Sequence, residues 1–185
     1  MAASAATLAF FVPKDAELFG QAVSVTKYNG VPALKFLKEY GASSPVPYCF
    51  FAGILLRTAT SGFSSTTGIQ VKIHWSAPHG QVSGAARWAV AWDLKGQTDK
   101  PTANADGTPA YGSTYEDAAN TTTNSTAGGL NVTSISCTIA HIQAALTTAP
   151  AIGDFFRLRL RRAVENAGDT ISDEVYVHAV ELVDY

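Results

Sequence analysis

Three stretches of the chain alternate between apolar and polar residues, as strands with one buried face do. They cover Ile69–Trp75, Arg87–Leu94 and Phe155–Arg162. A period of two places successive side chains on opposite faces of a sheet, so each stretch offers one apolar face to a core. The apolar set of the first two stretches is the predicted core face: Val71, Ile73, Trp75, Trp88, Val90 and Trp92.

Other segments also have strand character: Tyr48–Thr58, Leu130–Ile139 and Val175–Val183. The chain's 185 residues suffice for one well-buried domain and are too few for two comfortable ones. About seven to nine strands with little helix favour a sandwich over a parallel α/β fold. We therefore predict an all-β fold, a single jelly-roll-like antiparallel β-sandwich over residues 21–185.

Turn and loop signals divide the strands. Asn29-Gly30, after a short strand near Val23, is typical of a two-residue hairpin turn. Ala33–Leu37 is compatible with either a strand or a short helix. The longest irregular stretch, Gly96–Gly129, is polar, and a loop of that length in a compact domain is usually functional or makes subunit contacts.

The N-terminal segment, residues 1–20, is predicted to be an arm. It is apolar but shows no alternation that would place it in the chain's own sheet. Burying large apolar side chains is worth roughly 1.5 to 3 kcal/mol each before ordering costs, so leaving them in water is unfavourable. The arm must therefore be buried against its own domain or a neighbour, and our hypothesis is that it docks on a partner protein or a neighbouring protomer through Leu8, Phe10, Phe11 and Val12.

The charge of the chain limits the classes of partner that it can bind. The formal net charge is −2, which gives no electrostatic footprint for nucleic acid, and no segment has the roughly 18 to 20 apolar residues that span a bilayer. Charged residues are only 15%, which indicates either extensive subunit contacts or an uncharged polar surface. The last alternating stretch carries the one basic cluster of the chain, which is expected to form a solvated or ion-paired sheet face. Its members are Arg157, Arg159, Arg161 and Arg162. Its expected acidic partners are Glu165, Asp169, Asp173 and Glu174.

No catalytic or metal-binding pattern occurs in the sequence. The four histidines have no metal-ligand spacing, and nucleophile, phosphate-loop and dinucleotide motifs are missing. Cys49 and Cys137 each lie in an apolar run and are too few for a disulfide scaffold, although a pairing between them stays open. We therefore expect no enzyme activity, no cofactor and no metal.

Several segments taken together resemble virion structural proteins of tailed bacteriophages. They are Gly68–Trp75, Ser83–Trp92, Asp154–Arg162, Asn166–Thr170 and Val175–Val183, within a similarity that covers about residues 48–185. The resemblance implies a β-sandwich that assembles as a trimer on the virion, as a capsid decoration (cement) protein or a fibre component. It supplies no catalytic residues.

The main functional hypothesis is a non-enzymatic, trimeric decoration protein on the capsid exterior that binds the major capsid protein. Multivalent attachment would make several modest interfaces act together. Tyr111 and Tyr115 of the long loop are expected to add contacts to those of the arm. The alternative is a receptor- or carbohydrate-binding module of a tail fibre, in which the same tyrosines lie beside Asn104, Asp106 and Glu116.

Overall fold

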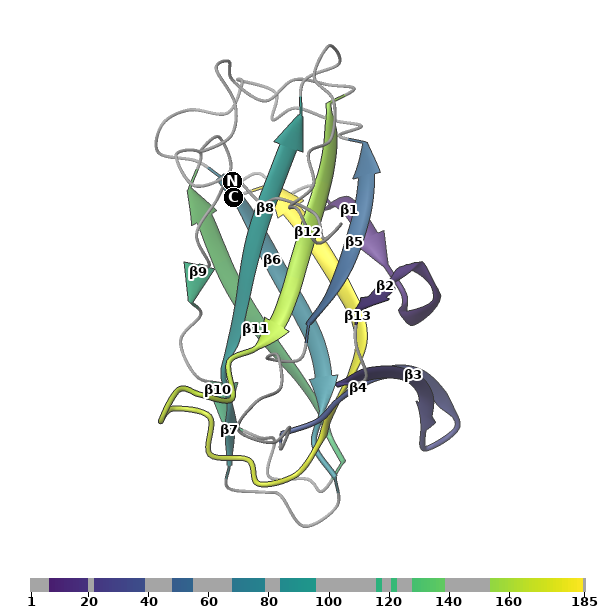
Figure 1. Cartoon of the computed structure of the whole chain (residues 1–185), viewed down its shortest axis with the longest axis vertical. Helices are drawn as coiled ribbons and strands as arrows, with labels where there is room; N and C mark the ends of the chain where they lie inside the picture. The colour runs from purple at the N-terminus through teal and green to yellow at the C-terminus, as the bar shows by residue number, and fades with distance from the viewer. Residues whose placement is uncertain are drawn as a thin grey trace, which may run out of the picture.

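The structure is a computed structural model of the whole chain. It describes residues 7–19, 22–38, 48–54, 68–78, 84–95, 116–117, 121–122, 128–138 and 154–184. Within these ranges nearly all regular structure is β-strand, and the single short 3₁₀ turn is η1 (Pro13–Asp15). Two antiparallel sheets pack face to face, which confirms the predicted sandwich (Figure 1).

The first layer is a six-stranded sheet with the order β11-β6-β13-β4-β3, to which β1 is added beside β13. Strand β13 pairs with β4 over its first residues and with β1 over its last ones, so both lie along the same edge of β13. The strands of this sheet are β1 (Thr7–Phe11), β3 (Val23–Tyr28), β4 (Val31–Phe36), β6 (Gly68–Ser76), β11 (Leu130–Thr138) and β13 (Val175–Asp184).

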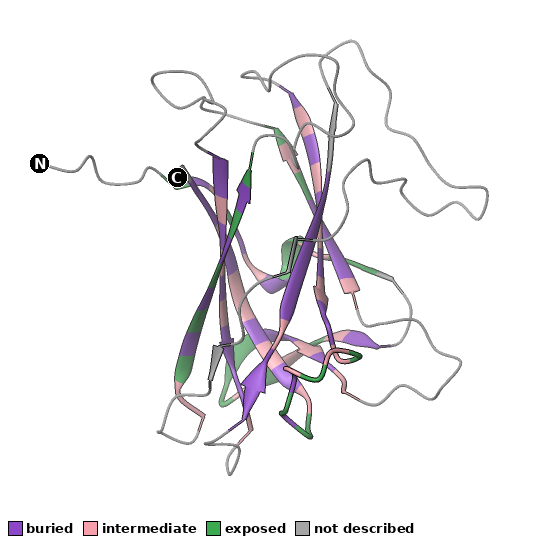
Figure 2. Cartoon of the chain, turned by 90° about the vertical axis from the view of Figure 1, so that its left-hand side faces the viewer, coloured by how far each residue is buried: buried purple, intermediate pink, exposed green. Residues whose placement is uncertain are grey.

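The second layer is a five-stranded sheet with the order β2-β5-β12-β8-β9. A separate two-stranded ladder joins β7 (Ala85–Ala86) to β10 (Thr121–Thr122). Figure 2 shows the two large sheets edge-on, with their buried positions facing each other. The strands of the second sheet are β2 (Glu17–Phe19), β5 (Tyr48–Ile54), β8 (Trp88–Lys95), β9 (Glu116–Asp117) and β12 (Phe155–Arg162).

The predicted core face is confirmed. All six of its members are at most 1% exposed, and the three tryptophans are among the largest fully buried side chains. The Trp88 ring lies 5.2 Å edge-on from Phe36 and 6.1 Å from Trp75, between centroids, so it joins the two sheets. Aromatic contacts of this kind contribute stability beyond that of the apolar area they bury.

The hairpin β3–β4 forms as its turn signal predicts. Tyr28 pairs with Val31, and the two turn residues Asn29 and Gly30 have φ of 50° and 82°. Positive φ at both positions defines a turn whose twist matches that of the strands, and asparagine and glycine tolerate it best. Of the segment Ala33–Leu37, left open between strand and helix, all but Leu37 belongs to strand β4, which ends at Phe36.

The expectation of an arm that docks outside its own sandwich is wrong for Thr7–Phe19. This segment supplies β1 to one sheet and β2 to the other. Leu8 and Phe11 are buried in the core, where the Phe11 ring lies 5.1 Å from that of Phe51. A register shift between Thr7 and Ala9 breaks the period of two, which hides the strand from a search for alternation.

Phe10 remains 58% exposed and Val12 is half-buried, so these two expected contact residues are still on the surface. Tyr111 and Tyr115 lie outside the described residues. No helix in the described part of the chain is long and apolar enough to cross a membrane.

Candidate functional site

The basic cluster of β12 divides between the two faces of its sheet. Arg157, Arg159 and Arg161 alternate with core residues, and the Arg161 guanidinium lies 2.6 Å from the Glu165 carboxylate, which confirms an ion-paired face there. Arg162 does not belong to that face. It is completely buried, because it is in phase with the core residues Leu158 and Leu160.

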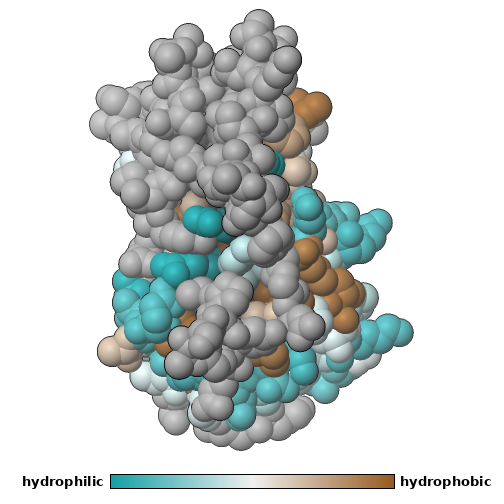
Figure 3. Space-filling model, in the orientation of Figure 1, coloured by the Kyte–Doolittle hydropathy of each residue, from teal (hydrophilic) through white to brown (hydrophobic). Residues whose placement is uncertain are grey.

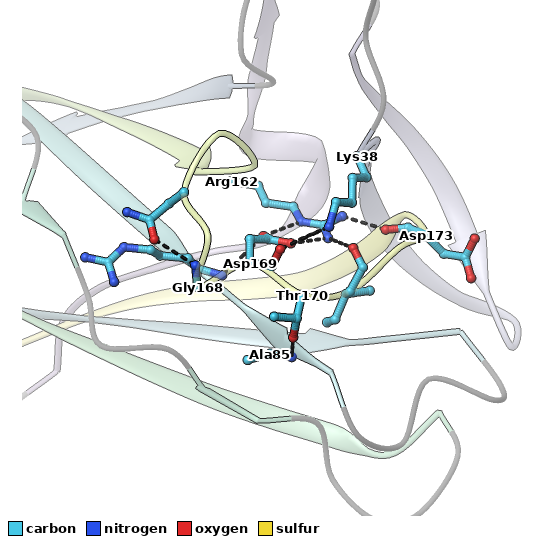
Figure 4. Close-up of polar contacts among 10 residues, drawn as sticks. Lys38, Ala85, Arg162, Gly168, Asp169, Thr170 and Asp173 are labelled. Carbon is cyan, nitrogen blue, oxygen red and sulfur yellow. Dashed lines mark hydrogen bonds and ion pairs between the residues drawn. The ribbon is translucent and has the colours of Figure 1, made fainter.

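The Arg162 guanidinium is held by a buried carboxylate and by two carbonyl groups (Figure 4). Its Nε and Nη2 donate to the two oxygens of Asp169 at 2.7 and 2.6 Å, a bidentate pair in which both side chains are 0% exposed. Nη2 also donates to the Ile171 carbonyl at 2.7 Å, and Nη1 donates to the Asp173 carbonyl at 2.6 Å. These partners satisfy a charge that would otherwise be costly to bury.

The same network ties the loop between β12 and β13 to neighbouring elements. The Arg87 amide donates to Asp169 Oδ2 at 3.2 Å, and the Lys38 ammonium donates to the Asp169 carbonyl at 3.0 Å. The Ala85 amide donates to Thr170 Oγ1 at 2.8 Å. Since the donors and acceptors here are engaged within the chain, this cluster is a structural clamp rather than a ligand site.

A groove with a different character lies on the outer face of the six-stranded sheet, where the hairpin β3–β4 meets the ends of β6 and β11. Its volume is about 320 Å³, and we call it the Tyr28 groove. Its lining residues come from five separate strands and two turns. The lining residues are Tyr28, Asn29, Val31, Ser76, Gly128, Leu130 and His178.

The aromatic wall of the Tyr28 groove is fixed on its far side. The ring of Tyr28 stacks on that of Tyr176, with centroids 4.3 Å apart and planes 20° apart. The Tyr28 hydroxyl donates to the Ala77 carbonyl at 3.0 Å, and the Tyr176 hydroxyl donates to Glu174 Oε1 at 2.9 Å. Burial and the bond to Glu174 raise the pKa of Tyr176 to about 12, so this phenol is neutral near pH 7.

His178 forms the polar side of the groove. Its Nε2 lies 3.1 Å from Ser76 Oγ, and its ring centroid is 6.3 Å from that of Tyr28. Burial lowers the pKa of His178 below its usual value; a hydrogen bond with the backbone of Pro32 opposes this, and nearby His74 lowers it further. The imidazole is therefore neutral at pH 7 and has one donor and one acceptor nitrogen.

A second hollow borders the Tyr28 groove. It has a volume of about 330 Å³, and we call it the Pro13 hollow. The 3₁₀ turn η1 forms its far wall, where the Val12 amide donates to Asp15 Oδ2 at 2.9 Å and so fixes the turn. The lining residues are Val12, Pro13, Lys14, Val31, Pro32 and His178.

A third hollow opens at the side of the sandwich, between β1 and β5. It holds about 430 Å³ and is apolar, and its rim carries Phe10 and Ile54, which are 58% and 54% exposed. Figure 3 shows separate hydrophobic patches on this right-hand side, with hydrophilic side chains between them. The lining residues are Leu8, Ala9, Phe10, Phe11, Gly53, Ile54 and Phe156.

The binding residues expected from sequence do not include those of the Tyr28 groove. Asn104 and Asp106 lie outside the described residues, as the two loop tyrosines do, and Glu116 lies in β9 with its side chain not described. The signal that points to the groove is the Asn29-Gly30 turn beside Tyr28, yet that signal does not indicate which strand the hairpin lies against.

Metal and thiol chemistry find no support in the described residues. Among them no group of three or more His, Cys, Asp or Glu side chains could hold a metal ion. Cys49 and Cys137 are buried thiols on opposite sheets and form no disulfide with each other. Burial raises the pKa of Cys49 far above its usual value, which leaves it unreactive.

Comparison with known proteins gives structural likenesses at low identity. No family model matches the chain, and no curated protein sequence matches it. A family 35 carbohydrate-binding module from Clostridium thermocellum is 11% identical, with a TM-score of 0.42 over 97% of this chain and 98% of that one. The CBM22-1 xylan-binding domain of Paenibacillus barcinonensis Xyn10C is 10% identical, with a TM-score of 0.43 over 100% and 97%.

The K1 cleaved adhesin domain of Lys-gingipain from Porphyromonas gingivalis W83 is 12% identical, with a TM-score of 0.39 over 96% of this chain and 97% of that one. At TM-scores below 0.5, these likenesses carry no argument about what this chain binds.

Proposed function

We propose that the chain is a non-catalytic carbohydrate-binding module whose sugar site is the Tyr28 groove. One observation carries the proposal: the fixed Tyr28 ring lies in one hollow with the exposed Asn29 amide and with the His178 imidazole, which is held 3.1 Å from the nearly buried Ser76 hydroxyl. A sugar ring has a face of C–H bonds that packs on an aromatic ring, and a rim of hydroxyls that require donors and acceptors. Ligand pockets typically combine such an apolar lining with a few placed polar groups.

The groove is prepared for a ligand before binding. The stack on Tyr176 and the bond to Ala77 hold the Tyr28 ring in place, so binding would order few side chains. Less ordering on binding leaves more of the contact energy as affinity. The neutral imidazole of His178 is likewise held in place, because its Nε2 lies 3.1 Å from Ser76 Oγ.

Binding without catalysis is the better proposal for the Ser76–His178 pair. A hydrolytic serine needs an exposed Oγ, a base oriented by a third group, and donors for an oxyanion. Ser76 is 3% exposed, which keeps its hydroxyl within the sheet surface. Within the described residues, no carboxylate contacts the His178 ring, and the nearby Glu181 lies against His74 instead, at 3.6 Å.

We expect Tyr28→Ala to weaken the binding of a polysaccharide by on the order of tenfold or more, because it removes the ring that a sugar face packs on. Affinity electrophoresis against a panel of soluble polysaccharides would find the ligand, and titration calorimetry would measure the loss. Val25→Ala is the matched control, since Val25 is 55% exposed on the same hairpin but does not line the groove.

Thermal unfolding of both variants would show that the hairpin still folds. The proposal fails if the wild-type chain retains none of the polysaccharides, or if folded Tyr28→Ala binds as tightly as the wild type.

Attachment to a shell of subunits is a second candidate function, and the apolar hollow between β1 and β5 favours it. Phe10 and Ile54 expose large apolar surfaces next to each other at the side of the sandwich, where a neighbouring protomer could cover them. The resemblance to virion proteins adds an expected trimer and an expected partner, the major capsid protein. Phe10 was already expected to be a contact residue.

For this candidate we expect the wild-type chain to sediment at about three times its 19.5 kDa mass. The double variant Phe10→Ser/Ile54→Ser should sediment as a monomer with an unchanged fold, because neither side chain lies in the core. Analytical ultracentrifugation over a range of micromolar concentrations makes the measurement. A wild-type monomer at every concentration would contradict the trimer.

A further inference from the structure

The Tyr28 groove and the Pro13 hollow are neighbours that share part of their lining. Val31 and His178 line both, so these two residues separate the hollows and contact each side. The path that results runs from the turn η1, across the start of β4, to the beginning of β11. A ligand in one hollow can therefore continue into the other without leaving the surface.

We infer that the ligand is an unbranched oligosaccharide long enough to occupy both hollows, with His178 beside the linkage between them. This inference rests on the proposed function. The hollows have volumes of about 320 and 330 Å³, each near the lower end of the 300 to 1,000 Å³ that is usual for ligand sites. A single sugar unit would fill one hollow and leave the other in water.

The two hollows differ in chemistry, so the bound oligosaccharide is expected to lie across them in one orientation. The Tyr28 groove offers the Asn29 amide, the His178 imidazole and an aromatic ring, so it distinguishes the positions of hydroxyl groups on a sugar. The Pro13 hollow is lined by Val12, Pro13 and Pro32, with Lys14 at its rim, so it packs on the apolar face of a sugar and tolerates more variation. The Tyr28 groove therefore recognises one end of the oligosaccharide, and the Pro13 hollow adds contact area at the other end.

The turn η1, which forms the far wall of the Pro13 hollow, is rigid enough to add affinity. Proline fixes φ, and the turn η1 is tied by the bond between the Val12 amide and Asp15. Once one sugar unit is bound in the Tyr28 groove, the next is held close to the Pro13 hollow, and its binding becomes intramolecular. Affinity should therefore rise with chain length until both hollows are filled, and then level off.

The test uses a series of oligosaccharides of increasing length, prepared from a polysaccharide that the wild-type chain retains. Titration calorimetry should show affinity rising on the order of tenfold or more along the series before it levels off. Val12→Ser should remove that gain while leaving the affinity for the shortest ligand unchanged. Tyr28→Ala should weaken binding at every length, and Val25→Ser should change nothing.

Methyl NMR reports the position of the ligand independently. The shortest ligand should shift the methyl signals of Leu130, longer ones should also shift those of Val12, and those of Val25 should stay in place. Affinity that is independent of length, or Val12 signals that the longest ligand does not move, would overturn the inference while leaving a single-hollow sugar site intact. If no oligosaccharide of any length binds, the proposed function itself fails.

Discussion

Replacing Arg162 by methionine is expected to lower the free energy of unfolding by about 3 to 5 kcal/mol, as for other broken buried ion pairs. The change leaves the Asp169 carboxylate in a site where its side chain is 0% exposed and its bidentate partner is gone. It also removes the donors to the Ile171 and Asp173 carbonyls, which hold the loop between β12 and β13. Equilibrium unfolding in urea measures the difference.

The neighbouring residue provides the control for Arg162. Arg161 pairs with Glu165, whose side chain is 48% exposed, so Arg161→Met should cost less than about 1 kcal/mol. Adding Asp169→Asn to Arg162→Met removes the buried charge that has lost its arginine and keeps only Lys38, at 3.7 Å, so the double variant should be more stable than the sum of the two single losses implies. An Arg162→Met loss no larger than that of Arg161→Met would show that the clamp does not support the fold.

The burial of Arg162 could have been predicted from the sequence. Alternation along β12 puts Arg162 in the same phase as Leu158 and Leu160, which are both fully buried. The residue type predicts exposure instead, since arginine is almost never fully buried unless it is paired. The partner, Asp169, follows only seven residues later, so phase and a nearby carboxylate together indicated a buried pair.

Strands with regular alternation were predicted to within two residues of their observed bounds. Ile69–Trp75 lies within β6, Arg87–Leu94 overlaps β8, and Phe155–Arg162 is β12 itself. Strand β1 was missed because its register shifts after Thr7, so its buried residues do not follow a period of two. A pattern search detects regular pairing and passes over a strand in which pairing is irregular.

The Tyr28 groove could not be predicted from the sequence, and the reason is physical. Its rings and polar groups come from strands far apart in the chain, and the order of strands in a sheet is set by long-range packing. Tyr28 on β3 stacks on Tyr176 on β13 although β4 lies between the two strands, and His178 lies at a register shift between Val177 and Ala179. A bulge of this kind redirects a side chain, and no local pattern in the sequence marks it.

Trp88→Ala is expected to cost about 3 to 5 kcal/mol of stability, which is usual for truncating a buried tryptophan. The ring is 0% exposed and packs edge-on against Phe36 from the opposite sheet, so its loss opens a cavity between the layers. Its indole nitrogen has no hydrogen-bond partner within the described residues, which makes the loss one of packing alone. Urea unfolding of Trp88→Ala beside Leu130→Ala, whose side chain is 54% exposed, gives the comparison. A Trp88→Ala loss below about 1 kcal/mol would mean that the sheets do not pack through this face, because a buried ring of that size cannot be removed so cheaply.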